Sequence, residues 1–409
     1  MRRVAITGAG AVSPVGNSPS EFFSNLMEGR SGVRRNTSAF SESLFVRIAA
    51  ESDFNPLDHF SKKELGLLDR VSQMAVIASR QAWKDAGVTL SEEEKLKSGV
   101  SVGTAMGGAG SLESTYVQLY RENASKVKPL TVLMAMSNAP ASHISMELGF
   151  KGACLSYTIA CSSSSVAIGE AYRLIKHGGA DVMVAGGAEA LLTYGVIKAW
   201  ESLGILAPED RDDPSASCKP FSRNRNGLVL GEGAVMFVLE ELESAKRRGA
   251  RIYAELSGYA TTADTFHITK PSVDGQARTI SLALEDASMV PEDIDYINAH
   301  GTATELNDLV ETQAIKKVFG DFAFRVPVSS TKSMHGHMMG ATGAAELLAA
   351  VLAVHNQALP PTANLVEKDP ACDLDYVPLK GRTGVRVRSA MSNSFAFGGT
   401  NAILIVRGA

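Results

Sequence analysis

The sequence contains few cysteines, and their spacing excludes two common uses of that residue. Four occur in 409 residues, and no two form a CxxC pair: Cys154, Cys161, Cys218 and Cys372. Small secreted domains that depend on disulfides are much richer in cysteine, and many structural zinc sites use CxxC pairs. We therefore expect a protein of a reducing compartment, with neither a disulfide framework nor a zinc knuckle.

The chain also lacks a strong excess of charge of one sign. Its net charge is −4, whereas a general nucleic-acid binder is usually basic. We expect no nucleic-acid partner. A local basic patch for an acidic protein partner stays open.

No hydrophobic run is long enough to cross a bilayer. The Ala/Leu-rich stretch at 344–354 carries Glu346 and is shorter than the roughly 20 residues of a transmembrane helix. Only four residues separate Met1-Arg2-Arg3 from Gly8, so we expect no secretory leader. The composition is 45% hydrophobic and 21% charged, which is typical of a soluble enzyme. We expect a cytoplasmic location and no membrane partner.

Strand-like and helix-like segments alternate along the chain. The strand-like segments are short and apolar: 4–7, 100–102, 182–185, 235–239, 252–256 and 294–299. Strands that are apolar on both faces and alternate with helices indicate an α/β fold, with helices covering a mostly parallel sheet. The charged stretch 240–251 marks the expected junction between two domains, 1–250 and 251–409.

The two parts show a similar order of segments. In each, a strand-like segment ends at polar, reactive-looking residues, and a helix rich in small residues follows. The first instance begins at Cys161, and the second runs from Ser329 through His337 to Ala353. No residue-level repeat is visible, so the order of segments alone suggests a duplication.

Cys161 is the strongest candidate for a catalytic nucleophile. It lies in Thr-Ile-Ala-Cys-Ser-Ser-Ser-Ser, where a strand-like segment ends and a small-residue helix begins. A helix N-terminus presents unpaired N–H groups and the positive end of its dipole, and both favour a thiolate. A buried structural thiol is the commoner fate of a free cysteine, but this setting favours nucleophilic catalysis.

Two downstream histidines complete a plausible catalytic set. His300 precedes a loop of small and hydroxyl residues, and His337 lies between Gly336 and Gly340. Each alone could be a core histidine, but together with Cys161 they indicate an active site. His335 we interpret as a bystander.

Lys332 and Glu346 flank the second histidine. A solvated lysine and a surface glutamate are the default readings, but Glu346 lies among alanines and leucines, where an unpaired carboxylate is costly. We expect a partly buried ion pair that orients His337.

Two glycine-rich segments have different interpretations. Gly8-Ala9-Gly10 lacks the third glycine of a dinucleotide fingerprint, so we interpret it as a structural turn. Near the C-terminus, Phe395 and Phe397 precede Gly398-Gly399. That segment is either the end of a core strand or a mobile flap over the cysteine.

Taken together, these residues resemble the elongating β-ketoacyl-[acyl-carrier-protein] synthases over essentially the whole chain. On that resemblance the catalytic residues are Cys161, His300, His337 and Lys332, with Glu346 in support and Phe397 as a gate. The resemblance implies a thiolase-like fold of two similar halves in a layered αβαβα arrangement, and a homodimer. It also implies no metal and no organic cofactor, because the substrates travel on the 4′-phosphopantetheine of acyl carrier protein.

The implied reaction is a decarboxylative Claisen condensation of an acyl-cysteine with malonyl-[acyl carrier protein], giving a 3-oxoacyl product. By the same resemblance, the backbone N–H groups of Cys161 and Phe397 form the oxyanion hole. The resemblance assigns substrate binding to further residues: Thr302 and Thr304 at the pantetheine arm, Thr269 as a weaker candidate, Met106 in the acyl channel, and Phe395.

Two other functions remain open at the level of sequence. A non-catalytic chain-length partner, which pairs with an active synthase as a heterodimer, usually lacks the nucleophile, so Cys161 argues against it. A degradative thiolase would need a second active-site cysteine. Ala396 stands where the family usually has glycine, which restricts the gate and hints at a specialised polyene or polyketide chain.

Overall fold

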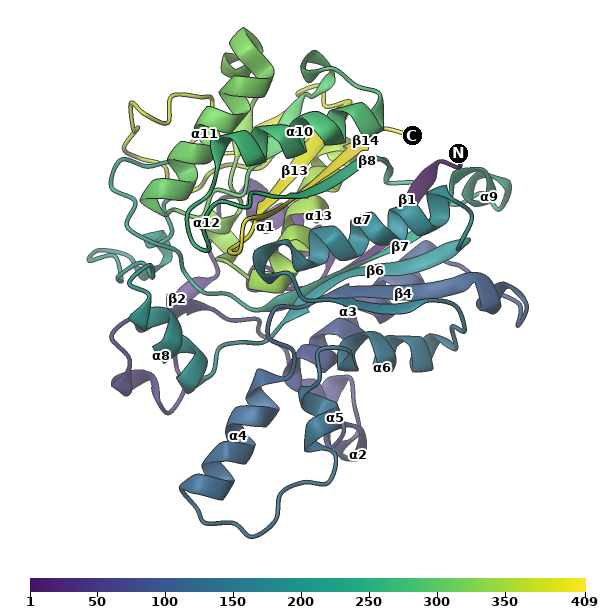
Figure 1. The fold of residues 1–409 in the computed structure, drawn as a ribbon, viewed down its shortest axis with the longest axis vertical. Helices are drawn as coiled ribbons and strands as arrows, with labels where there is room; N and C mark the ends of the chain where they lie inside the picture. The colour runs from purple at the N-terminus through teal and green to yellow at the C-terminus, as the bar shows by residue number, and fades with distance from the viewer.

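The computed structural model describes residues 1–409 and is built on one large mixed β-sheet flanked by helices. Ten strands form this sheet in the order β10-β9-β13-β14-β8-β1-β7-β6-β4-β5 (Figure 1). Their bounds are β1 Val4–Val12, β4 Ser98–Gly103, β5 Cys154–Tyr157, β6 Val182–Glu189, β7 Gly233–Glu241, β8 Ala254–Ala263, β9 Tyr296–Asn298, β10 Val328–Ser329, β13 Ser389–Phe395 and β14 Thr400–Arg407.

The expectation of a mostly parallel sheet is wrong. Strand β4 runs parallel to β5 and β6, and β9 runs parallel to β10 and β13, but every other neighbouring pair is antiparallel. Parallel neighbours need a crossover connection, usually a helix. Strands β13 and β14 are instead joined by the short turn 396–399, which returns the chain directly to the neighbouring position.

The strand order repeats in the two halves of the chain. Numbered within its own half, each set of five strands follows the order third, second, fourth, fifth, first. The two sets meet where Val4–Ile6 of β1 pairs with Ala254–Leu256 of β8. The predicted two similar halves are therefore present as a repeated topology.

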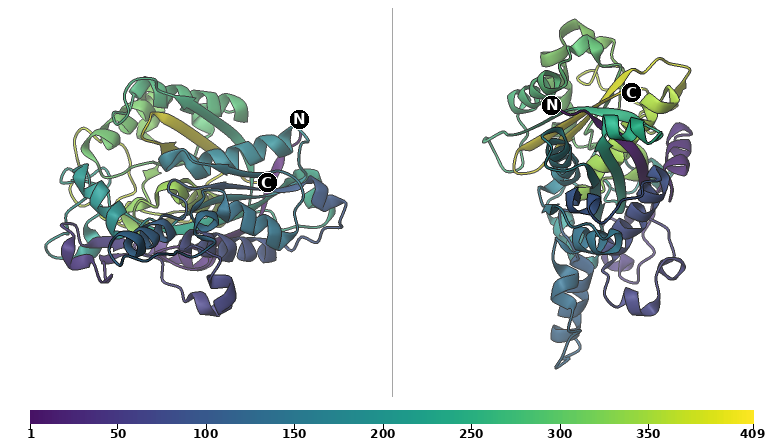
Figure 2. Two further views of the ribbon diagram at one scale, coloured as in Figure 1. Left: turned by 60° about the horizontal axis from the view of Figure 1, so that its bottom comes forward. Right: turned by 90° about the vertical axis from the view of Figure 1, so that its right-hand side faces the viewer.

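The helices form three layers around the two halves of the sheet. Helices α7 (Ser163–Lys176) and α13 (Thr342–Asn356) pack against each other and against strands of both halves. Helix α3 (Arg70–Ala86) covers the first half, and α10 (Val273–Ala287) with α11 (Glu305–Phe319) covers the second (Figures 1 and 2). This is the expected αβαβα arrangement, and it buries α13 from Thr342 to Val354.

Smaller elements complete the fold. The remaining helices are α1 Pro19–Met27, α2 Lys62–Leu65, α4 Ala109–Tyr120, α5 Thr131–Ala135, α6 Ala139–Leu148, α8 Tyr194–Ser202, α9 Leu242–Arg247 and α12 Lys332–His335. Two short ribbons pair β2 Val33–Arg35 with β3 Ile48–Ala50 and β11 Ala358–Leu359 with β12 Arg382–Thr383. Helices α4 and α5 project from the body (Figure 1). None of the helices combines the length and apolarity that a membrane crossing needs.

Several glycines allow helices to approach the sheet closely. The expected turn at Gly8-Ala9-Gly10 is wrong, because β1 continues through these residues, with a shift of pairing register just before Gly8. A Cβ at Gly10 would lie 2.0 Å from the carbonyl oxygen of Ala78 in α3. At the end of β4, a Cβ on Gly103 would lie 2.3 Å from the backbone of Ser163, where α7 begins. Glycine at 103 therefore sets how near the start of α7 lies to the sheet.

Candidate active site

Cys161 lies in a tight connection between β5 and α7. A single 3-10 turn, η4 (Ala160–Ser162), precedes the helix, and Ala160 has φ +44°. Such a φ is strained for a residue with a Cβ. The Ser162 hydroxyl holds the turn by donating to the carbonyls of Ser394, at 3.1 Å, and Thr400, at 3.0 Å. Cys161 is thus fixed against the β13–β14 turn, 5% exposed.

The structure brings Cys161, His300 and His337 together. The sulfur and one nitrogen of each imidazole all lie within 4.8 Å of one another. The two rings meet edge to face, with centroids 5.5 Å apart. His300 follows β9, and His337 lies between α12 and the turn η8 (Met339–Ala341), so the cluster joins the N-terminal half to two segments of the C-terminal half.

Hydrogen bonds define which nitrogen of each imidazole carries the proton. The Nδ1 of His300 lies 3.3 Å from the ammonium of Lys332, and the Nδ1 of His337 accepts the N–H of Met339 at 3.1 Å. Both Nδ1 atoms are acceptors, so each Nε2 carries hydrogen. Burial lowers the pKa of both histidines well below the ordinary value, and the charge of Lys332 adds to that effect. The site therefore presents two neutral N–H donors.

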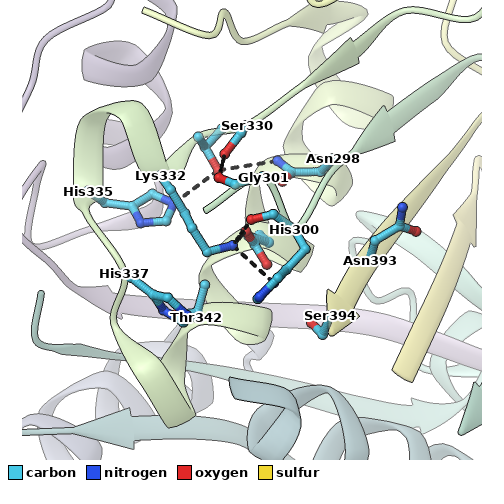
Figure 3. Close-up of polar contacts among 12 residues, drawn as sticks. Asn298, His300, Gly301, Ser330, Lys332, His335, His337, Thr342, Asn393 and Ser394 are labelled. Atoms are coloured by element: carbon cyan, nitrogen blue, oxygen red, sulfur yellow. Dashed lines mark hydrogen bonds and ion pairs between the residues drawn. The ribbon is translucent and has the colours of Figure 1, made fainter. Parts of the chain in front are cut away.

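Lys332 and Glu346 form an ion pair that is completely buried. The Lys332 ammonium also donates to the carbonyl of His300 (Figure 3). The expectation was a partly buried ion pair that orients His337. The pair is instead fully buried, and its ammonium bonds to His300 at the end of β9. Burial raises the pKa of Glu346, and the ammonium of Lys332 opposes that rise.

The resting state of Cys161 is the thiol. Burial raises its pKa to about 11, against the opposing effects of the Lys332 charge and of the N–H groups of Phe397 and Cys161 itself. The expected thiolate stabilisation by the helix N-terminus is therefore outweighed by desolvation. The N–H groups of Phe397 and Cys161 nevertheless lie beside the sulfur, where they can donate to the carbonyl oxygen of an acyl group carried on it.

A cavity of about 340 Å³ opens from this cluster to the surface. Its lining includes most of the expected site residues: Cys161, His300, His337, Thr302, Thr304, Thr269, Phe395 and Phe397. Lys332 and Glu346 lie behind the histidines. Met106 is not part of the lining and its side chain is 45% exposed. His335 is buried outside the cavity, bonded to Thr331 and the carbonyl of Gly336.

Two carboxylates that sequence reasoning missed support the site. Glu311 accepts the N–H groups of His300, at 2.8 Å, and Gly301, at 2.7 Å. Glu189 accepts the N–H groups of Ala105, at 2.7 Å, and Gly340, at 3.0 Å. Burial raises the pKa of each to about 7. The sequence held one signal for Glu311: a helix there would place it on the same face as the apolar Ile315, four residues on.

The cluster has some features of a metal site, but its electrostatics oppose one. A thiolate and two imidazoles are common ligands of zinc. The ammonium of Lys332, 3.3 Å from His300, would repel a divalent cation there.

A second group of atoms lies deeper in the protein. One side-chain oxygen each of Asn298, Asn393 and Glu346 is buried without a hydrogen-bond partner, and oxygens of this kind are the ligands that a hard cation prefers.

Comparison with known proteins gives a consistent result over the full chain. The model of the β-ketoacyl synthase N-terminal domain matches residues 1–245, and that of the C-terminal domain matches residues 253–366. Nodulation protein E of Rhizobium meliloti (strain 1021) is 44% identical over 403 residues, which cover 98% of each chain. The 3-oxoacyl-[acyl-carrier-protein] synthase 2 of Staphylococcus aureus (strain COL) is 40% identical, over 99% of this chain and 98% of that one.

Solved structures agree. A β-ketoacyl synthase from Burkholderia phymatum STM815 superposes with a TM-score of 0.92 at 37% identity, covering 100% of both chains. The ishigamide ketosynthase/chain length factor gives a TM-score of 0.90 at 35% identity, covering 100% of this chain and 99% of that one. A ketosynthase solved in complex with its type II polyketide acyl-carrier protein gives 0.91 at 32% identity, with the same coverage.

Proposed function

The chain belongs to the β-ketoacyl synthase family, and we propose that Cys161, His300 and His337 carry out its reaction. That reaction is the decarboxylative condensation of an acyl-enzyme thioester with malonyl-[acyl carrier protein], which lengthens the chain by two carbons. The observation that carries the assignment of residues is the convergence of one sulfur and two neutral N–H donors within 4.8 Å, at the end of a single cavity.

The first half-reaction loads Cys161. Its sulfur attacks the thioester carbonyl of an acyl carrier protein, and the N–H groups of Cys161 and Phe397 stabilise the oxyanion. The bond to the carrier sulfur breaks, and the proton of the Cys161 thiol passes to that leaving thiolate. No net base is consumed, which suits a cysteine that rests as a thiol.

The second half-reaction uses the histidines as donors. The thioester oxygen of malonyl carrier protein accepts the Nε2–H groups of His300 and His337, which stabilises the enolate formed as CO2 leaves. The enolate carbon attacks the acyl-cysteine, the C–S bond breaks, and the released sulfur takes up one proton. A base is not required, in agreement with the depressed pKa of both histidines.

Other residues take supporting roles in this proposal. Thr302 and Thr304, whose hydroxyls lie 2.9 Å apart in the cavity wall, hold the pantetheine arm. Thr269 lies farther out and Phe395 nearer the histidines. The acyl-channel role of Met106 stays a prediction. The condensation needs no metal or organic cofactor, since departure of CO2 generates the nucleophile.

The partner in this reaction is acyl carrier protein, and we propose that the chain acts as a homodimer in the cytoplasm. The proposed division near residue 250 is supported by the repeat of strand order between β7 and β8. The relatives named above include a 3-oxoacyl-[acyl-carrier-protein] synthase 2 and an ishigamide ketosynthase, so the test below uses a panel of acyl chains.

The two rival functions fit the site less well. A chain-length partner without catalysis would have no use for a complete set of Cys161, His300 and His337. A thiolase would need a second cysteine, but Cys161 is the only cysteine in the cavity lining.

The test is a reconstituted condensation. Purified protein is offered a panel of acyl carrier proteins with malonyl carrier protein, and products are read by intact mass. We expect 3-oxoacyl products from the wild type and from Cys218→Ala, and no acyl-enzyme from Cys161→Ala. Acylation that persists in Cys161→Ala would refute the nucleophile, and activity only after addition of a partner synthase would favour the accessory role.

A further inference from the structure

The ring of Phe397 rests on a tryptophan from the other half of the molecule. The Trp200 and Phe397 rings are nearly parallel, at 21°, with centroids 6.1 Å apart. Both line the cavity that contains Cys161. Since the N–H of Phe397 points at the Cys161 sulfur, the position of this one residue affects both access to the cavity and the oxyanion hole.

Trp200 is the fixed side of this contact. It lies on α8, whose Glu201 accepts the N–H groups of Phe45, at 2.7 Å, and Val46, at 2.9 Å. The ammonium of Lys198 lies 2.7 Å from the same carboxylate. These bonds fasten the helix to the loop before β3, so the indole has a stable support.

Phe397 is on the side that can move. Gly398 and Gly399 follow it with φ of +86° and +74°, and nothing lies within 4 Å of a Cβ position at Gly398. Ala396 has a negative φ, so the alanine there fits the backbone without strain, and the glycine pair provides the hinge. The glycine pair can act as a hinge, and the closed turn is held by the Trp200 ring together with backbone bonds from the Gly398 N–H to the Ile268 carbonyl, at 2.8 Å, and from the Asp264 N–H to the Gly399 carbonyl, at 2.7 Å.

We propose that Trp200 is the closing contact of the Phe397 gate, a positioning residue that keeps the Phe397 N–H on Cys161. The inference rests on the proposed function and adds the residue that regulates the gate. An aromatic pair of this kind shifts an equilibrium by about twofold to tenfold. Loss of the indole therefore lowers the ratio of closed to open gate by that factor.

Kinetics test the gate through substitutions that keep or remove the stack. Trp200→Leu should lower kcat for condensation by about twofold to tenfold, with little change in KM for malonyl carrier protein, because the oxyanion hole is less often assembled. Trp200→Phe keeps an aromatic ring and should restore most of kcat. Equal kcat in the leucine and phenylalanine variants would overturn the proposal.

Fluorescence gives a readout that does not depend on turnover. The chain has two tryptophans, and Trp83, on α3, packs against Phe150. In Trp83→Phe the emission comes from Trp200 alone. We expect this emission to change when Cys161 is acylated by acyl carrier protein, and the change to disappear in Phe397→Leu. If Trp83→Phe misfolds, the difference between wild type and Trp200→Phe supplies the same signal.

Failure of the gate and failure of the proposed function give different results. Intact mass follows acylation of Cys161 in the same sample. Acylation without any change in Trp200 emission overturns the gate contact and leaves the function intact. Absence of acylation contradicts the function, and alkylation of Cys161 by iodoacetamide then provides the adduct with which the Trp200 signal is tested. Leu203→Ala, which alters the same cavity wall, is the matched control and should retain the signal.

Discussion

Burial and nearby charge have opposite effects on the pKa of Cys161. Desolvation raises the pKa of Cys161 to about 11, while Lys332 and two N–H groups favour the thiolate. The balance leaves a protonated thiol that is protected from adventitious chemistry. In the proposed reaction the sulfur loses its proton to the carrier thiolate that departs.

This balance predicts how Cys161 reacts with iodoacetamide. For a pKa of about 11, the thiolate fraction rises about tenfold per pH unit, so alkylation should accelerate without a plateau from pH 7 to about 10. An ordinary thiol would level off near its pKa of about 8.5. The rate is measured by intact mass, with Cys161→Ala as the correction for the other thiols. A plateau near neutral pH would show that the thiolate is the resting form.

The residues found from sequence and those missed differ in a physical way. Cys161, His300 and His337 each have glycine or hydroxyl residues beside them in the sequence, and these neighbours indicated a functional site. Glu189 instead acts through contacts with Ala105 and Gly340, which are distant in sequence, and no local pattern carries such information. The pKa of Cys161 was misjudged for the same reason, because burial is a property of the folded chain.

At the scale of elements, the start of α7 depends on the strands beneath it. Gly103 of β4 and Gly187 of β6 both face the first turn of this helix, and a Cβ on Gly187 would lie 2.4 Å from the Cβ of Ser164. The sequence predicted that a strand gives way to a helix at Cys161. It did not reveal how close that helix lies to the sheet.

Gly103→Ala should disturb the nucleophile through this contact. The new Cβ would lie 2.3 Å from the backbone of Ser163 and Ser164, and overpacking of this kind costs about 1–3 kcal/mol. We expect the free energy of unfolding in urea to fall by that amount. Acyl transfer should fall by roughly 10–100-fold, since a shift of about 1 Å in a reacting group has that effect.

The matched control for this substitution is Gly179→Ala. Its Cβ would meet only Leu174, at 3.4 Å, and should change neither quantity. A normal rate of acyl transfer in Gly103→Ala would mean that the approach of α7 to β4 does not position Cys161.

At the scale of the whole molecule, the repeated topology explains where the site lies. Helices α7 and α13 occupy equivalent places in the two halves and pack against each other at the centre. Cys161 precedes the first helix and His337 precedes the second. The sequence showed the same order of strand, reactive residue and helix in both halves. The antiparallel pairing of strands was not predictable from sequence, because whether two strands are parallel depends on which strands become neighbours in the sheet.

One face of the molecule is incomplete as a monomer. Strand β5 ends the sheet with an unpaired edge, and helices α4 and α5 expose large apolar side chains, among them Tyr120, at 80%, and Val132, at 68%. Open edges and clustered apolar surface of this kind are usually covered by a partner chain. A second copy of the chain, packed on α4, α5 and β5, would cover both features.

Charge placed on this face should therefore separate the subunits. Val132→Glu puts a carboxylate into the expected interface, where an unpaired buried charge costs about 3–5 kcal/mol, enough to weaken the dimer by at least about a hundredfold. Sedimentation velocity should show a dimer for the wild type and a monomer for Val132→Glu at micromolar concentration. Val366→Glu, at a position 74% exposed outside this face, is the control and should remain dimeric. A dimer that survives Val132→Glu would place the interface elsewhere, and the exposed apolar side chains of α4 and α5 would then need a different partner.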